Sequence, residues 1–325
     1  MGGRRLIGAL LAWTAMTVMS ASLCAQPYPS RPIRLIVPSS PGGANDIIGR
    51  LWAERLGSFA TFVVENRGGA GTLLGTTEVA RGTPDGYTLL LGSTNTHVLQ
   101  PLSTSNRSYD PVADFAPISI LGTTATAIAI SGKLPMTSLR EFVAHARANP
   151  GQVSFGHAGP GSNTFYTAEM FRQVAGGLDI KGVPYRGVGP SFADLSNGHI
   201  QMIVVNVTGQ VMEYHTTGMI RVLAVNAIER IASAPQVPTS AEAGLPGLVS
   251  QTFYATFAPA RTPPEVLAAL DRTTQDALRD PEFRAKLASS GYDPLQGIGT
   301  EKAAQYVAAE YARWEPMIRR INTQN

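Results

Sequence analysis

Two glycine-rich loops are the part of this sequence best suited to chemistry. Residues 38–46 (PSSPGGAND) and residues 156–163 (GHAGPGSN) each lie between a predicted strand and a predicted helix. Glycine lets the backbone approach a ligand closely, and the unpaired N–H groups at a helix N-terminus suit an anion. The recurrence of this arrangement in both halves of the chain favours an anion site. The alternative is structural: Asn45 or Asp46 caps the first helix, Ser162 or Asn163 caps the second, and the glycines only form turns.

A third predicted loop, residues 92–97 (GSTNTH), follows another predicted strand and supplies neutral hydrogen-bond donors. Its histidine, His97, has no second histidine nearby in the sequence. A metal site usually brings several such ligands together, so a structural role is the stronger expectation for His97.

Enzyme motifs are weak throughout the chain. The Gly69-Ala70-Gly71 segment resembles a dinucleotide fingerprint, but the next glycine, Gly75, comes one residue late for that motif. The sequence shows no nucleophile elbow, zinc-protease motif or phosphate-binding loop, and its five histidines are scattered. His157 and Ser162 could be paired as base and nucleophile, but they lie on one short loop. We therefore expect no enzymatic activity, cofactor or metal, and an exported hydrolase remains the alternative.

The N-terminus has the layout of a secretory signal peptide. Arg4 and Arg5 precede an apolar run from Leu6 to about Val18, and small residues lead to Ala25. The run is shorter than the roughly 20 residues that a bilayer requires. We therefore predict a signal peptide at residues 1–25, with a lipoprotein anchor at Cys24 as the alternative, and a periplasmic location.

Composition excludes several classes of protein. Cys24 is the only cysteine, so the chain after residue 25 contains no disulfide and no thiol nucleophile. The chain has 26 Lys and Arg residues against 23 Asp and Glu, and without Arg4 and Arg5 the balance is 24 to 23. Because no segment concentrates positive charge, we expect no nucleic-acid partner. About 300 residues suffice for two ordinary cores, and we expect a soluble monomer.

The elements that would position the loops alternate between strand and helix. This alternation predicts βαβ units and a largely parallel sheet. The predicted strands cover residues 33–37, 61–65, 87–91, 153–155, 180–184, 200–205 and 220–226. The predicted helices cover residues 46–56, 72–81, 138–148, 163–174, 264–279, 281–289 and 301–320.

Two further apolar, β-rich segments, residues 123–131 and 252–259, are candidates for connections between two lobes. They predict a first lobe of residues 26–125 plus 251–325 and a second lobe of residues 126–250. A cleft between two such lobes is a common ligand site.

A series of motifs resembles the Bug family, the substrate-binding proteins of tripartite tricarboxylate transporters (TctC type). The motifs occur in order over nearly the whole chain after residue 25. They are Tyr28-Pro29-Ser30-Arg31-Pro32-Ile33, Val37-Pro38, Pro41-Gly42-Gly43 with Asp46, Val64-Glu65-Asn66-Arg67, Gly69-Ala70-Gly71, Pro84-Asp85-Gly86-Tyr87-Thr88-Leu89, Tyr109-Asp110-Pro111 with Asp114-Phe115, Ala158-Gly159-Pro160-Gly161-Ser162, Val183-Pro184-Tyr185-Arg186-Gly187, Asp194-Leu195, Leu223-Ala224-Val225, Val237-Pro238-Thr239 and Glu242-Ala243-Gly244.

The resemblance implies a two-lobed α/β fold of the periplasmic-binding-protein type (type II-like, Venus flytrap), with a mostly parallel sheet in each lobe. It implies that the loops hold a ligand carboxylate, helped by bridging waters, and that the partners are membrane transporter subunits. A membrane sensor kinase is the alternative partner. Family ligands include tricarboxylates, dicarboxylates, acidic amino acids and aromatic acids. The implied ligand-binding residues are Ser39, Ser40, Pro41, Gly42, Gly43, Asp46, Ser93, Thr94, Asn95, Ala158, Gly159, Gly161, Ser162, Asn163 and Asn206.

Two positions depart from the family pattern. Phe165 stands where many members have His, and Asn206 stands where many have Asp. Loss of the Asp charge favours a more anionic ligand, whereas an apolar Phe favours an aromatic acid. The identity of the ligand therefore stays open at this stage.

Overall fold

The computed structural model describes residues 28–104, 107–159, 161–185 and 188–324, without the side chains of residues 70, 188, 189 and 322–324. The predicted signal peptide lies outside these residues. The described residues from Arg31 onward form one compact unit. Within the described residues, no helix has the length and apolar character needed to cross a membrane.

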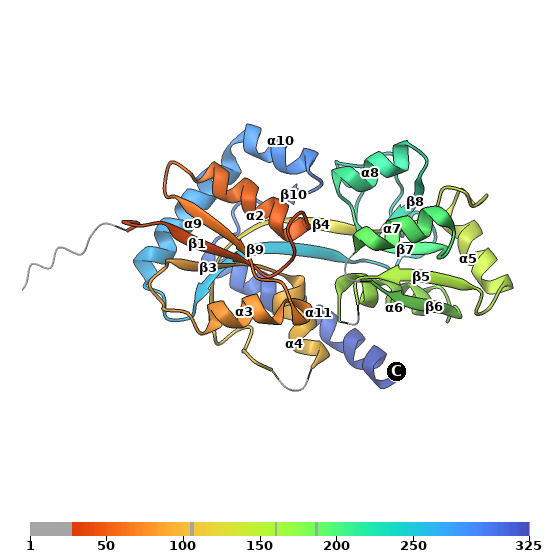
Figure 1. Cartoon of the computed structure of the whole chain (residues 1–325), viewed down its shortest axis with the longest axis horizontal. Helices are drawn as coiled ribbons and strands as arrows, with labels where there is room; N and C mark the ends of the chain where they lie inside the picture. Colours follow the sequence, from red (N-terminus) through yellow and green to blue (C-terminus); the bar gives the residue numbers. More distant parts are fainter. Residues whose placement is uncertain (1–27, 105–106, 160, 186–187, 325) are drawn as a thin grey trace, which may run out of the picture. The chain divides into compact units, whose positions relative to one another are not determined.

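The strands and helices alternate along most of the chain (Figure 1). The strands are β1 (Ile33–Val37), β2 (Phe62–Asn66), β3 (Thr88–Ser93), β4 (Phe115–Ser131), β5 (Val153–His157), β6 (Ile180–Pro184), β7 (Met202–Asn206), β8 (Ile220–Val225), β9 (Gln251–Pro259) and β10 (Asp293–Pro294). The helices are α2 (Ala44–Arg55), η1 (Ala70–Thr72), α3 (Leu73–Ala80), η2 (Asn95–Leu99), α4 (Gln100–Ser103), α5 (Leu139–Ala148), α6 (Asn163–Val174), α7 (Val188–Asn197), α8 (Gly209–Thr216), α9 (Pro264–Arg279), α10 (Pro281–Ser289) and α11 (Thr300–Gln324).

The described strands form one sheet in the order β2-β1-β3-β9-β4-β7-β5-β6, and β8 and β10 also pair with β4. Pairing is parallel where β1 meets β2 and β3, and where β5 meets β6 and β7. Strands β4 and β9 pair antiparallel with their neighbours and join the two parallel parts. The predicted α/β class is confirmed.

Strand β4 changes partners in its middle. Ala125 pairs with Gln251 of β9, whereas the next residue, Thr126, pairs with Asn206 of β7. The chain returns beside this point, because Ser250 accepts a hydrogen bond from the Thr126 N–H at 3.0 Å. We call β1, β2, β3, β9, β10 and residues 115–125 of β4 the first strand group. The second strand group comprises β5, β6, β7, β8 and residues 126–131 of β4.

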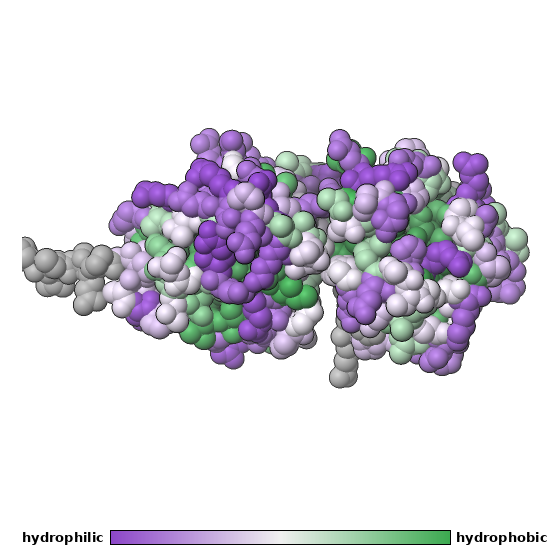
Figure 2. Space-filling view, turned by 90° about the horizontal axis from the view of Figure 1, so that it is seen from above, coloured by the Kyte–Doolittle hydropathy of each residue, from purple (hydrophilic) through white to green (hydrophobic). Residues whose placement is uncertain are grey.

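Figure 1 shows helices α2, α3, α9 and α10 around the first strand group and helices α5, α6, α7 and α8 around the second. Figure 2 shows an indentation in the surface at the horizontal position where the two groups meet. Helix α2 is fixed in the first group by buried contacts, since Trp52 Nε1 donates to Thr274 Oγ1 at 3.1 Å. At the other end of α2, Tyr292 OH donates to the Ala44 carbonyl at 2.6 Å.

Most predicted elements are confirmed, and three expectations require correction. Residues 92–97 are not a loop, because β3 extends to Ser93 and a helical turn, η2, begins at Asn95. Strand β4 begins at Phe115, well before the predicted residue 123. Residues 252–259 were expected to connect two lobes, but β9 pairs only within the first strand group. The chain therefore passes between the groups at the first residue of β9, Gln251.

Candidate functional site

A cavity of about 1010 Å³ lies between the two strand groups and is lined mainly by loop and helix residues beside each group. Every described lining residue is uncharged. They are Pro38, Ser39, Ser40, Gly42, Gly43, Ala44, Ile47, Gly68, Gly69, Gly71, Thr72, Asn95, Ala158, Gly161, Ser162, Asn163, Thr164, Phe192, Asn206, Thr208, Gly209, Gln210, Val211 and Ser290. The size and the mixture of apolar and neutral polar groups are those of a small-molecule site.

The loop between β1 and α2 presents a bare helix N-terminus to the cavity. Gly43 is the N-cap of α2, and no side chain accepts a hydrogen bond at this cap. Gly43 and Ala44 both line the cavity. Because the first N–H groups of an α-helix have no partner within the helix, the start of α2 can donate hydrogen bonds to an anion.

Asp46 supports this loop from behind and does not line the cavity. It is buried, and its carboxylate accepts hydrogen bonds from Gly42 N at 2.9 Å, Arg50 Nε at 2.9 Å and Asn66 Nδ2 at 2.9 Å. Burial raises the pKa of Asp46, but these hydrogen bonds outweigh it and lower the pKa below its ordinary value. Asp46 is therefore ionised at neutral pH, and Arg50 balances its charge.

The loop between β5 and α6 differs from the first because its helix is capped. Ser162 Oγ accepts a hydrogen bond from Phe165 N at 3.2 Å and donates to the Gly159 carbonyl at 2.6 Å. Asn163 N donates to Asn95 Oδ1 at 3.2 Å, which joins this helix to the first strand group. Helices α2, α3, α6 and α8 all begin at or next to cavity-lining residues. Ser162 and Thr208 cap α6 and α8, whereas the starts of α2 and α3 have no side-chain cap and are consequently more available to a ligand.

Three buried polar atoms of cavity-lining residues have no hydrogen-bond partner within the described part of the chain: Ser39 Oγ, Thr72 Oγ1 and Asn206 Oδ1. Thr72 is also the only described non-glycine residue with a positive φ, at 86°. A β-branched residue in this conformation is strained, and such strain is often found at functional sites.

The predicted ligand-binding residues divide into two sets. The first set lines the cavity: Ser39, Ser40, Gly42, Gly43, Asn95, Ala158, Gly161, Ser162, Asn163 and Asn206. The second set does not line it: Pro41, Asp46, Ser93, Thr94 and Gly159. Ser93 and Thr94 are fully buried, and Thr94 Oγ1 accepts a hydrogen bond from Phe253 N at 3.0 Å, so Thr94 ties β3 to β9.

Sequence reasoning missed the apolar part of the wall. Ile47, Phe192 and Val211 line the cavity from three different helices, α2, α7 and α8. Their spacing looks like that of ordinary core positions, so no signal in the sequence marks them. Phe165, by contrast, does not line the cavity; its ring packs against His157, with ring centroids 5.1 Å apart.

The histidines have structural roles. His97 is fully buried, its ring stacks on Phe257 with centroids 3.7 Å apart, and burial lowers its pKa to about 3. His157 Nδ1 accepts a hydrogen bond from Gly159 N at 3.1 Å, and Ser162 Oγ donates to the Gly159 carbonyl rather than to His157. The described residues contain no cluster of His, Cys, Asp and Glu that could hold a metal ion.

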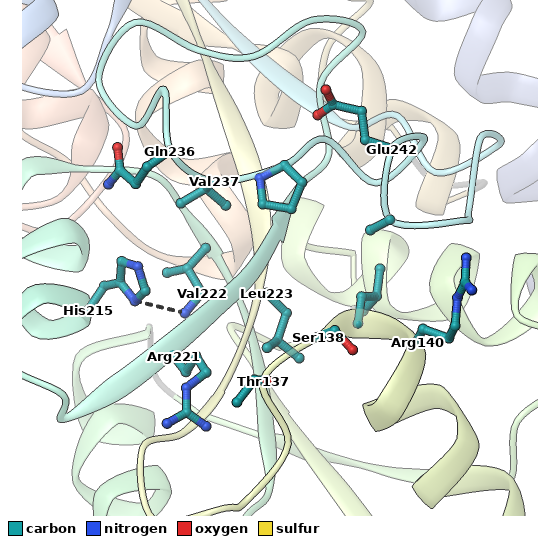
Figure 3. Close-up of a pocket in the computed structure, with 13 residues that line it drawn as sticks. Thr137, Ser138, Arg140, His215, Arg221, Val222, Leu223, Gln236, Val237 and Glu242 are labelled. Carbon is teal, nitrogen blue, oxygen red and sulfur yellow. Dashed lines mark hydrogen bonds between the residues drawn. The ribbon is translucent and has the colours of Figure 1, made fainter.

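A second cavity, of about 610 Å³, lies beside β8 and shares no lining residue with the first (Figure 3). Several of its polar groups already have partners. Arg221 Nη1 donates to the carbonyls of Leu134 and Met136, and His215 Nδ1 accepts from Val222 N at 3.3 Å. Glu242 is paired with Arg230 at 3.0 Å. The cavity between the strand groups therefore remains the stronger candidate site.

Comparison with known proteins gives a consistent result. Residues 50–323 match the model of the tripartite tricarboxylate transporter family receptor. The protein BugT of Bordetella pertussis is 33% identical over 97% of each chain. The solved structure of the periplasmic binding protein BugD is 28% identical, with a TM-score of 0.81 over 90% of this chain and 98% of that one.

The structure of Rpa4515 of R. palustris with adipate is 31% identical to this chain, with a TM-score of 0.84 over 90% of this chain and 97% of that one. By their names, the matching family is one of receptors and BugD is a binding protein. The expected periplasmic-binding-protein fold is confirmed.

Proposed function

The chain belongs to the tripartite tricarboxylate transporter receptor family, and on that premise we propose that it captures a small carboxylic acid in the cavity between its strand groups. The protein binds the acid reversibly, without turnover, and delivers it to the membrane subunits of a transporter. Its location is the periplasm, reached through a signal peptide at residues 1–25. The adipate held by the similar protein Rpa4515 supports a carboxylate ligand.

The observation that carries this proposal is the bare N-terminus of α2 at the cavity wall. The ligand carboxylate lies against Gly43 and Ala44, where the first turn of α2 has no side-chain cap and the helix dipole stabilises a negative charge. Ser39 and Thr72 supply hydroxyl groups that lack partners in the described part of the chain. Bridging waters complete these contacts.

In our proposal the protein consists of two lobes, and the cavity opens and closes as they move relative to each other. The lobes are residues 26–125 with 251–325, and residues 126–250. The change of β4 partners between Ala125 and Thr126 supports the first boundary. The return of the chain at Ser250 and Gln251 supports the second. Neutral donors suit this cycle, because they hold an anion in the closed state without an opposing charge that slows its release.

A thermal-shift experiment on residues 26–325 tests the proposal. Each acid of a broad panel is compared with its primary amide, for example benzoate with benzamide and succinate with succinamide. A cognate acid at a hundredfold excess over its dissociation constant should stabilise the protein by about 2.7 kcal/mol, whereas its amide should stabilise it far less. NMR of the recovered acid should show it unchanged. If no acid in the panel raises the melting temperature above its amide, carboxylate binding is wrong; if the acid is consumed, binding without turnover is wrong.

A further inference from the structure

The geometry points to a ligand class: we infer that the cavity selects a carboxylic acid whose body is apolar, such as a medium-chain or aromatic acid, over short hydroxylated acids. This inference rests on the proposed function, because it assumes that a carboxylate occupies the start of α2. It concerns the rest of the ligand, which extends from the carboxylate into the cavity.

Ile47 fixes the surroundings of the ligand atoms closest to the carboxylate. It follows Gly43 by four residues and Ala44 by three, so all three lie on one face of α2, and all three line the cavity. A ligand whose carboxylate lies at Gly43 and Ala44 therefore places its next carbons beside the Ile47 side chain. A hydroxyl group on those carbons would lose its water and gain no partner from isoleucine.

The opposite wall continues this apolar surface. Phe192 of α7 and Val211 of α8 line the cavity from the second strand group, and both belong to one hydrophobic cluster in that group. Phe192 is held in place by an edge contact with Tyr214, with ring centroids 5.1 Å apart. The two residues thus present a fixed apolar surface across the cavity from α2.

Three hydroxyl side chains on the same wall are occupied by the protein itself, whereas Asn206 Oδ1 has no partner in the described part of the chain. Thr208 Oγ1 accepts from Val211 N at 3.4 Å and caps α8. Ser162 Oγ caps α6, and Thr164 Oγ1 accepts from Ala158 N at 2.9 Å. Because these hydroxyls satisfy backbone N–H groups, they are less available to a polar ligand than their number suggests.

Calorimetric titration of residues 26–325 with acids of one carbon count tests the inference. Hexanoate, gluconate and adipate all have six carbons, but gluconate is polyhydroxylated and adipate carries a second carboxylate. We expect hexanoate to bind at least tenfold more tightly than gluconate. Along acetate, butanoate and hexanoate, the affinity should rise by up to about fourfold for each methylene group that becomes buried.

Matched variants test which residues cause the preference for an apolar acid. Ile47→Thr should reduce the ratio of hexanoate to gluconate affinity at least threefold, whereas Ile228→Thr should leave it unchanged, because Ile228 is 75% exposed and does not line the cavity. Phe192→Leu is a second variant that keeps an apolar residue in the hydrophobic cluster and should weaken the binding of phenylacetate more than that of hexanoate.

The outcomes separate this inference from the proposed function. If gluconate, adipate or another hydroxylated, amino or dicarboxylic acid binds more tightly than every apolar acid, the inference is overturned and the proposed function stands. An unchanged affinity ratio in Ile47→Thr also overturns the inference. If no carboxylic acid binds at all, the proposed function itself fails.

Discussion

Gly43 gives the cavity its anion-binding character at the scale of single residues. Most helices begin with a side chain that accepts a backbone N–H, but α2 begins with a glycine that leaves these donors open. Two other helices that begin at the cavity, α6 and α8, are capped by Ser162 and Thr208. The difference predicts that a carboxylate prefers the start of α2 to the starts of α6 and α8.

Gly43→Asp should abolish this preference without unfolding the protein. A Cβ atom at this position meets its nearest neighbour, the Ser40 carbonyl oxygen, at 3.4 Å, and Asp is a better N-cap than Gly by a few tenths of a kcal/mol. The new carboxylate occupies the donors that the ligand needs. Calorimetry should show at least a tenfold loss of affinity for the acid, with an unchanged melting temperature.

Gly43→Asn is the matched control, because it has nearly the same size and capping ability but no charge. It should lose less affinity than Gly43→Asp. If Gly43→Asp bound the acid with the wild-type affinity, the carboxylate would not lie at the start of α2.

Thr72 combines a strained backbone with a buried hydroxyl that has no partner in the described part of the chain. Thr72→Gly removes both, and it should raise the free energy of unfolding by about 0.5–1.5 kcal/mol because glycine adopts a positive φ freely. We expect the same variant to bind the acid more weakly. Urea denaturation and calorimetry measure the two effects.

Thr72→Ala separates the two causes, because it loses the hydroxyl but keeps the strain. It should bind as weakly as Thr72→Gly without the gain in stability. A Thr72→Gly protein that is both less stable and fully able to bind would contradict a functional role for this strain.

Sequence reasoning at this scale found the loops but not the role of each residue. Asp46 was expected at the ligand or as a simple cap, and the structure places it behind the loop, bonded to Gly42, Arg50 and Asn66. Such a bond pattern depends on Asn66, which is far along the chain and comes close only because β1 and β2 are neighbours. Local spacing carries no information about that contact.

At the scale of elements, strand β4 shows where sequence patterns fail. Pro117 and Gly122 interrupt its apolar run, so the pattern predicts a start near residue 123. The strand accommodates both residues at irregularities in its register with β9. Gly122 also allows β10 to approach, since a Cβ atom there would lie 2.7 Å from the Asp293 carbonyl oxygen. Helices bounded by proline, such as α9 and α10, were predicted well because proline suits the first helical turn.

Gly291, just after α10, holds this element against the second strand group. It has a φ of 91°, and a Cβ atom there would lie 2.6 Å from the Val207 carbonyl oxygen. Gly291→Ala should therefore lower the free energy of unfolding by about 2–4 kcal/mol, through backbone strain and the clash. The new methyl group would push Val207 and Thr208 away. Because Thr208 and Gly209 line the cavity, the variant should also weaken acid binding.

Gly297→Ala is the control for backbone strain alone. Gly297 has a φ of 70°, but a Cβ atom there would have no neighbour within 4 Å. Chemical denaturation should show a loss of only about 1 kcal/mol. Equal losses for the two variants would mean that the contact with Val207 is unimportant.

At the scale of the whole molecule, the cavity lies where β4 passes from one group of strands to the other, pairing with both. Neither group supplies a complete wall: Gly43 and Ile47 come from the first, and Phe192 and Asn206 from the second. The α/β class follows from the alternation of strands and helices in the sequence. The apolar wall does not, since it depends on how α2, α7 and α8 face one another across the cavity.

The most direct test is a crystal structure of residues 26–325 with the acid that binds most tightly. The quantity to measure is the distance from the ligand carboxylate oxygens to the backbone nitrogens of Ala44 and Asn45. We expect at least one distance, direct or through a single water, to be that of a hydrogen bond, about 2.7–3.2 Å. A carboxylate bound at the start of α6 alone, or in the cavity beside β8, would contradict the account.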